Sequence, residues 1–193
     1  MDELIVQDVP PGLTEAARAE RARFEARRRR VLQEAQLVSL SILVWGQNPA
    51  SASPVAQKRK EIRDELERLG HNAMFSEDLA SSGLGLSAKS EEFAQAMAVH
   101  LIIILVEDAP GALAEAHDFC NHPKVAPNVY ILIPQRYRDG YSAQGAIKDL
   151  EDGYGGVYWY ADDEISSCNV KKLALKRAEA RRQILARFSS VMS

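Results

Sequence analysis

Short apolar runs alternate with amphipathic segments along most of this chain. The runs lie at residues 40–45, 72–75, 99–106, 129–133 and 156–160. Between most of them, apolar residues recur three or four positions apart, which is the spacing of one helix face. The alternation of strands and helices with short connections predicts a parallel sheet joined by right-handed crossovers. We therefore expect an α/β fold.

Local signals set several of the expected helix ends. Ser53 and Pro54 supply an N-cap and a first-turn proline, and Gly70 ends the helix that follows. The buried face of that helix is predicted to hold Val55, Ile62, Leu66 and Leu69. Further helices are expected around 93–97, from Gly111, over 142–150 and over 170–188. The last has an apolar stripe of Val170, Leu173, Ala174, Ala178, Ile184, Leu185 and Phe188.

The order of these elements predicts a doubly wound, flavodoxin- or Rossmann-like sheet. Five mainly parallel strands are expected in the order 2-1-3-4-5, with an extra N-terminal helix and a C-terminal helix. The run at 99–106 lacks alternation, which is typical of a central strand covered on both faces. The polar residues 76–78 predict a loop, and the Ser- and Gly-rich segment 79–89 predicts a mobile one.

Residues 14–36 form a separate pattern. They are rich in Ala, Arg and Glu and contain no Gly or Pro, which predicts a helix. Its apolar side is thin and consists of Leu13, Ala17, Phe24 and Val31. The basic block 27–30 suits phosphate or an acidic partner, and equally suits a solvated helix balanced by glutamates. We divide the chain into an N-terminal tail with a basic helix, 1–37, and an α/β domain, 38–193.

Composition excludes several classes of protein. The net charge of −3 provides no strong nucleic-acid signal. No run approaches the roughly 18 apolar residues of a membrane span, and the acidic amino terminus lacks the apolar core of a signal peptide. The two cysteines and four histidines have no metal-ligand spacing, so no metal is expected. We expect a cytoplasmic protein without a membrane partner.

The segment 100–119 holds the best candidate for a catalytic group. An apolar strand ends in acidic residues, turns through Pro110 and Gly111, and enters a helix that carries Glu115. This layout places Glu115 at the carboxyl edge of the sheet, where open α/β proteins bind ligands. We expect the carboxylate in the first helical turn, where the helix dipole favours its ionised form. Acidic residues are also common at helix starts for that reason alone.

Two segments carry a resemblance to known enzymes. The strand, the Pro110-Gly111 turn and Glu115 resemble the nucleoside 2-deoxyribosyltransferase-like and TIR-like group of N-glycosidases. The segment Leu43-Val-Trp-Gly-Gln-Asn-Pro-Ala-Ser51 and the following 61–75 are similar to the opening of such domains. The resemblance covers about residues 38–162. It implies cleavage of a ribose–base bond, with Glu115 acting at the anomeric carbon.

The fold places further candidate substrate-binding residues near Glu115. If the strand order is 2-1-3-4-5, the loops after the first and third strands flank one crevice. Trp45, at the end of the first strand, is expected in the core. The candidate ligands for a base, ribose or phosphate are Gly46, Gln47, Asn48, Ser76, Glu77, Asp108, Pro110 and Gly111. For Asn48 and Asp108, an ordinary role in a turn is the competing interpretation.

Two functions remain open at this point. The first is an N-glycosidase, hydrolase or deoxyribosyltransferase, that takes NAD or a nucleotide as substrate and needs no other cofactor. By resemblance, such domains serve as effectors of bacterial antiviral defence, activated by homo-oligomer formation or by a protein partner. The N-terminal helix is then a candidate assembly surface. The alternative is a non-catalytic module that binds a nucleotide signal or mediates self-association, because one fold hosts many functions.

Overall fold

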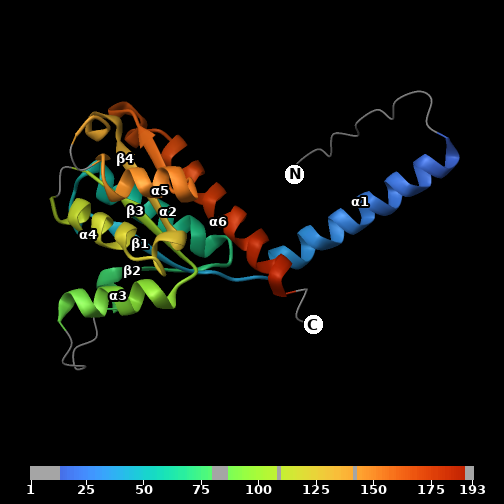
Figure 1. Cartoon of the computed structure of the whole chain (residues 1–193), viewed down its shortest axis with the longest axis horizontal. Coiled ribbons are helices and arrows are strands. Elements are labelled where there is room, and N and C mark those ends of the chain that lie inside the picture. The colour runs from blue at the N-terminus through green and yellow to red at the C-terminus, as the bar shows by residue number, and fades with distance from the viewer. Residues whose placement is uncertain (1–13, 80–86, 108–109, 141–142, 190–193) are drawn as a thin grey trace.

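A computed structural model describes residues 14–79, 87–107, 110–140 and 143–189. Within these ranges, one parallel sheet has the strand order β2-β1-β3-β4-β5 (Figure 1). This confirms the predicted fold class and order. The strands are β1 (Ser41–Gly46), β2 (Asn72–Phe75), β3 (Leu101–Leu105), β4 (Val129–Pro134) and β5 (Val157–Tyr160).

Helices cover both faces of the sheet and divide the core in two. Helix α2 (Pro54–Arg68) and α6 (Asn169–Ser189) pack on one face. Helix α3 (Ala88–Ala98), α4 (Pro110–Asn121) and α5 (Ala146–Tyr154) pack on the other. Every residue of β3 and β4 is buried, because both faces of these strands are covered. This explains why their apolar runs do not alternate with polar residues.

Local capping accounts for where several helices begin. Ser53 Oγ accepts a hydrogen bond from Ala56 N at 3.1 Å, and Pro54 follows as the first helical residue of α2, as predicted. Ser87 caps α3 in the same way, through Ser90 N at 3.3 Å. The loop predicted over 79–89 is therefore too long at both ends. Its first residue belongs to a 3₁₀ turn, η1 (Ser76–Leu79), and residues 80–86 lie outside the described ranges. The same turn replaces the polar loop expected at 76–78.

Four other expectations need correction. Helix α5 lies four residues later than predicted, because Gly155 takes a left-handed conformation (φ 57°) and ends the helix there. Helix α4 begins at Pro110, one residue earlier than predicted. Leu69 is 41% exposed, because it is the C-cap of α2 and lies past the buried face. Ile184 of α6 is 43% exposed, so it does not belong to the buried stripe of that helix.

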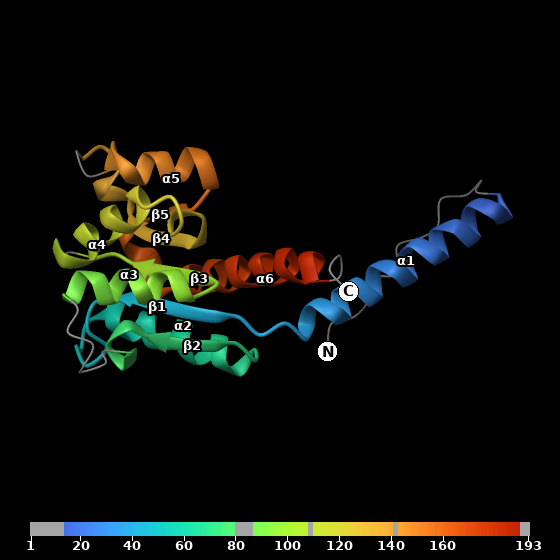
Figure 2. The same ribbon diagram turned by 60° about the horizontal axis from the view of Figure 1, so that its bottom comes forward.

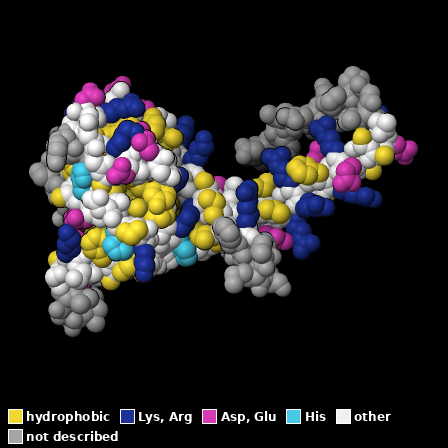
Figure 3. All heavy atoms as spheres, in the orientation of Figure 1, with side chains coloured by type: hydrophobic (Ala, Val, Ile, Leu, Met, Phe, Trp, Pro, Cys, Tyr) yellow, Lys and Arg dark blue, Asp and Glu magenta, His cyan; other side chains and the backbone are white. Residues whose placement is uncertain are grey.

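Helix α1 (Glu15–Gln36) projects from the α/β domain (Figures 1 and 2). It is capped by Thr14, whose side chain accepts a hydrogen bond from Ala17 N at 3.3 Å. It contacts α6, and Ala35 is its one buried residue. Arg side chains alternate with hydrophobic ones along this projecting helix (Figure 3). Its apolar side therefore faces solvent.

Across the described ranges, no helix combines the length and the apolar character that crossing a bilayer requires.

Candidate functional site

A pocket of about 290 Å³ lies where β1 and β2 end and where α3 and α4 approach them. The strand order reverses between β1 and β3, and ligands of open α/β sheets bind at such a point. The described residues that line the pocket are Trp45, Gly46, Ser76, Glu77, Ala88, Glu91, Glu92, Gln95 and Glu115. Gly46, Ser76, Glu77 and Glu115, which the sequence analysis selected from three separate segments, therefore lie together.

Glu115 is held by a residue from the first strand. Its Oε2 accepts a hydrogen bond from Trp45 Nε1 at 2.5 Å. Trp45 is 3% exposed and packs edge-to-face on Phe119 of α4, with ring centroids 4.9 Å apart. The prediction that Trp45 belongs to the core is confirmed. The indole also supplies a donor to the pocket, which apolar patterning alone does not reveal.

The electrostatic setting of Glu115 differs from the expected one. Glu115 is the sixth residue of α4, and the first turn of this helix contains no acidic residue. Burial raises the pKa of Glu115, and the negative charges of Glu92 and Glu77 add to this. The hydrogen bond from Trp45 and the charge of Arg59 act in the opposite direction but do not cancel it. The expectation that the helix dipole would favour the ionised form was wrong, because α4 begins at Pro110 and Glu115 therefore lies beyond its first turn.

A raised pKa changes what the carboxyl group can do. A carboxyl group whose pKa lies closer to neutrality exchanges a proton more readily at the pH of a cell. Once ionised in a half-buried pocket, it also stabilises a developing positive charge more strongly than a solvated carboxylate does. The arrangement therefore suits a reaction in which a cationic centre forms next to Glu115.

Arg59 organises the rim of this pocket, and sequence analysis missed it. The side chain is fully buried on α2. Its Nη1 and Nη2 donate to the two carboxylate oxygens of Glu77 at 2.8 and 2.6 Å. The guanidinium also donates to the backbone carbonyl oxygens of Val44, Gly46 and Gln47. The helical spacing of Val55, Arg59, Ile62 and Leu66 places an arginine within the apolar stripe, and this was the available signal.

Glu77 is fixed by this pairing. Burial raises the pKa of Glu77, but the hydrogen bonds from Arg59, from the backbone and from Ser76, together with the positive charge of Arg59, outweigh that effect, and the pKa is lowered overall. Ser76 Oγ donates to Glu77 Oε2 at 3.0 Å. Glu77 therefore stays ionised at the pocket rim while Glu115 is shifted toward its protonated form. The two carboxyl groups have opposite tendencies in one small site.

Gly46 is required where β1 ends. Its φ is 142°, and a Cβ atom at this position would lie 2.5 Å from the carbonyl oxygen of Leu105 in β3. This close approach lets the first and third strands meet at the pocket floor. Gly46, which the sequence analysis selected as a candidate ligand-binding residue, is therefore also required for the close contact between β1 and β3.

The remaining residues predicted to bind the substrate are Gln47, Asn48, Pro110, Gly111 and Asp108. Gln47 Oε1 accepts from Ser53 Oγ, and Asn48 Oδ1 accepts from Ala50 N at 2.8 Å. Neither is among the described residues that line the pocket. Pro110 and Gly111 are the first residues of α4, about one helical turn before Glu115. Asp108 lies outside the described residues.

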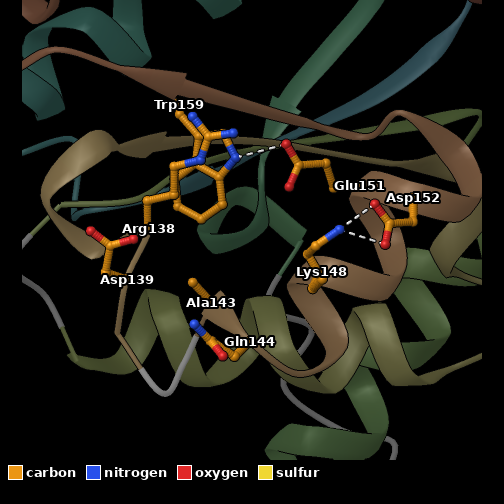
Figure 4. A pocket seen from close by; sticks show the side chains of 8 residues that line it. All are labelled: Arg138, Asp139, Ala143, Gln144, Lys148, Glu151, Asp152 and Trp159. Atoms are coloured by element: carbon orange, nitrogen blue, oxygen red, sulfur yellow. Dashed lines mark hydrogen bonds and ion pairs between the residues drawn. The ribbon is translucent and has the colours of Figure 1, made fainter.

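A second pocket, of about 500 Å³, lies beside α5 and β5 (Figure 4). Trp159 Nε1 donates to Glu151 Oε1 at 3.0 Å, and Lys148 pairs with Asp152. The guanidinium of Arg138 lies 5.9 Å from the centre of the Trp159 ring. This pocket is larger, but it shares no lining residue with the Glu115 pocket and lies away from the switch point of the sheet. We therefore assign the chemistry to the smaller pocket.

No known protein-family model matches this chain, and no curated protein matches it either. Function is therefore inferred from the chemistry of the pocket. Within the part of the chain that the structure describes, no group of three or more His, Cys, Asp or Glu side chains is placed to hold a metal ion.

Proposed function

We propose that this protein is an N-glycosidase that cleaves the ribose–base bond of NAD or a nucleotide. One observation carries the proposal: Glu115, a half-buried carboxyl group with a raised pKa, lines a pocket at the switch point of the sheet. Carboxylates perform glycoside cleavage by attacking the anomeric carbon or by stabilising an oxocarbenium-like transition state. The resemblance of 38–162 to deoxyribosyltransferase-like and TIR-like domains supports the same assignment.

The residues around Glu115 have separate roles in this reaction. The bond between the anomeric carbon and the base nitrogen breaks, and the base keeps the bonding electrons. Glu115, in its ionised form, balances the positive charge that develops on the sugar. The Trp45 N–H holds one carboxylate oxygen, so that the carboxylate keeps one orientation. Water then completes the hydrolysis, or a second base completes a transfer.

Base release is the direct test of this proposal. We expect the protein to release nicotinamide from NAD, or free base from a nucleotide or deoxynucleoside, as measured by mass spectrometry. Glu115→Gln should abolish release because the amide cannot carry the negative charge. Asp118→Asn is the matched control on the same helix, since Asp118 pairs with Lys89 on the surface. Equal turnover by the wild type and Glu115→Gln would contradict a catalytic Glu115.

A second candidate function is self-association through α1. Phe24 is 63% exposed, and Val31 and Leu32 are also exposed on the projecting helix. Exposed apolar residues that recur along a helix are typical of a surface that binds another helix. We propose that a second copy of this chain binds there, and that assembly activates the enzyme in antiviral defence.

Tight binding of a nucleotide without release of a base would instead favour the alternative function, a non-catalytic module that binds a nucleotide signal.

A further inference from the structure

The charge of the Glu115 pocket is one-sided. All charged side chains among the described residues that line it are acidic: Glu77, Glu91, Glu92 and Glu115. The neighbouring cations have other partners. Arg59 is fully buried and donates to Glu77 and to backbone carbonyls, and Lys89 pairs with Asp118 at 2.8 Å.

This charge selects among possible substrates. A phosphate group near Glu91 and Glu92 would meet like charges in a pocket that is partly shielded from water, where repulsion is strong. A cationic group would be attracted for the same reason. Sites that bind the phosphates of nucleotides instead present Arg, Lys or the N-terminus of a helix. The described lining of this pocket contains neither Lys nor Arg. Ala88, the first residue of α3, also lines it, but Glu91 already places a negative charge in the first turn of that helix.

The size of the pocket also favours a substrate smaller than a dinucleotide. Pockets for small molecules span roughly 300–1,000 Å³, and this one has about 290 Å³. A volume just below that range suits a nucleoside. A dinucleotide such as NAD would have to leave its second half outside the pocket.

Gln95 adds an independent observation that points to a ligand. Its Nε2 donates to the carbonyl oxygen of Leu79 at 3.3 Å, whereas its Oε1 is buried and has no hydrogen-bond partner within the described structure. Gln95 also lines the pocket. An unpaired buried acceptor is costly unless a donor satisfies it. The carboxamide of a pyridinium base or the exocyclic amine of a purine is such a donor.

We infer that the substrate is a positively charged nucleoside without a phosphate group, such as an N-ribosylpyridinium or an N7-alkylated purine nucleoside. This inference rests on the proposed N-glycosidase reaction at Glu115, and it changes the expected substrate from NAD or a nucleotide to a nucleoside. The glycosidic bond breaks, and the base leaves as a neutral molecule because the bonding electron pair cancels its positive charge. The base therefore needs no proton. The oxygen of water bonds to the anomeric carbon, and one proton is released.

Nicotinamide riboside and nicotinamide mononucleotide provide the sharpest comparison, because they share one cationic leaving group and differ by a phosphate. We expect kcat/KM for nicotinamide release to be at least about tenfold higher for the riboside than for the mononucleotide or NAD. 7-Methylguanosine should likewise be preferred over guanosine. Because methylation also weakens the glycosidic bond, this second pair is compared by calorimetric Kd on the inactive Glu115→Gln variant.

A variant tests whether the acidic lining causes the preference. Glu92→Gln removes one negative charge from the pocket, so the riboside-to-mononucleotide ratio of kcat/KM should fall about threefold or more. Glu67→Gln is the control, because Glu67 lies on the exposed surface of α2. An unchanged ratio in Glu92→Gln would remove the electrostatic basis of the inference.

The outcomes separate the two proposals. Faster cleavage of the mononucleotide, NAD or a neutral nucleoside overturns the inference on substrate charge but leaves the N-glycosidase proposal intact. Absence of base release from all of these glycosides overturns the N-glycosidase proposal itself. Preference for the riboside over the mononucleotide, reduced by Glu92→Gln and abolished by Glu115→Gln, supports both.

Discussion

Trp45 Nε1 donates a hydrogen bond to Glu115 Oε2 and so joins the end of β1 to helix α4. The two residues are 70 positions apart in the sequence. The rest of the indole is packed in the core against Phe119, so the donor has little freedom to move. A carboxylate held by a rigid donor keeps its orientation toward a substrate without a further entropic cost.

Trp45→Phe should impair base release without unfolding the protein, because phenylalanine preserves most of the packing and removes the donor. A hydrogen bond to a charged group contributes about 1.5–3 kcal/mol, so we expect activity to fall about tenfold or more. Loss of the donor also raises the pKa of Glu115 further. Activity requires ionised Glu115. In a pH profile of kcat, the rise in activity should therefore occur at higher pH for Trp45→Phe than for the wild type. Trp159→Phe, which loses the indole bond to Glu151 in the other pocket, should leave this profile unchanged.

Arg59→Met should destabilise the fold strongly. The substitution leaves Glu77 and the carbonyl oxygens at the end of β1 without their donor, and methionine cannot replace it. Breaking such a pair costs about 3 kcal/mol or more, which urea unfolding will measure. Arg68→Met is the control, since its pairing with Glu65 lies on the surface. Similar losses in both variants would contradict an organising role for Arg59.

Gly46→Ala should destabilise the protein by about 2 kcal/mol or more. The new Cβ would lie 2.5 Å from the Leu105 carbonyl oxygen, at a φ of 142° that side chains rarely adopt. Gly153→Ala offers a matched control on α5, because a Cβ there meets nothing within 4 Å. Thermal unfolding should show a loss for the first variant and a gain of about 0.5 kcal/mol for the second. An unaffected Gly46→Ala variant would show that β1 and β3 can separate at this point.

His71 should make stability depend on pH. Burial, with the positive charge of Arg182 at 2.8 Å, lowers the pKa of His71 from 6.5 to about 4. The folded state therefore binds fewer protons than the unfolded state between these values. The contribution of His71 is fully present above pH 6.5 and is lost as the pH falls toward 4; it amounts to at most about 3 kcal/mol. The free energy of unfolding, measured with urea, should differ less between pH 7 and pH 5 for His71→Gln than for the wild type. An equal pH dependence in both proteins would argue against this assignment.

Helix α1 should mediate formation of a dimer or larger oligomer. Phe24→Gln with Val31→Gln removes two exposed apolar side chains from this helix. We expect light scattering to show a shift toward the monomer, because the buried apolar area of the interface is lost. Tyr154→Gln is the control, since Tyr154 is exposed on α5. A wild type that is monomeric at high concentration would contradict the proposed assembly.

Local patterns in the sequence were enough to predict the strands, their order and most helices. Apolar periodicity, the cap at Ser53 and the stop at Gly70 act within a few residues, so they can be read without knowing the fold. Parallel strands with short crossovers then leave few topologies, and the pocket edge followed from that order. Glu115, Glu77, Ser76 and Gly46 were selected in this way.

Tertiary structure decided the chemistry of the site. The Trp45–Glu115 bond, the pairing of Arg59 with Glu77 and the acidic neighbours of Glu115 all join segments far apart in the sequence. A pKa depends on burial and on charges across space, and periodicity records neither. The sequence could therefore indicate where a carboxyl group lies, but only the packed structure decides whether that group holds its proton.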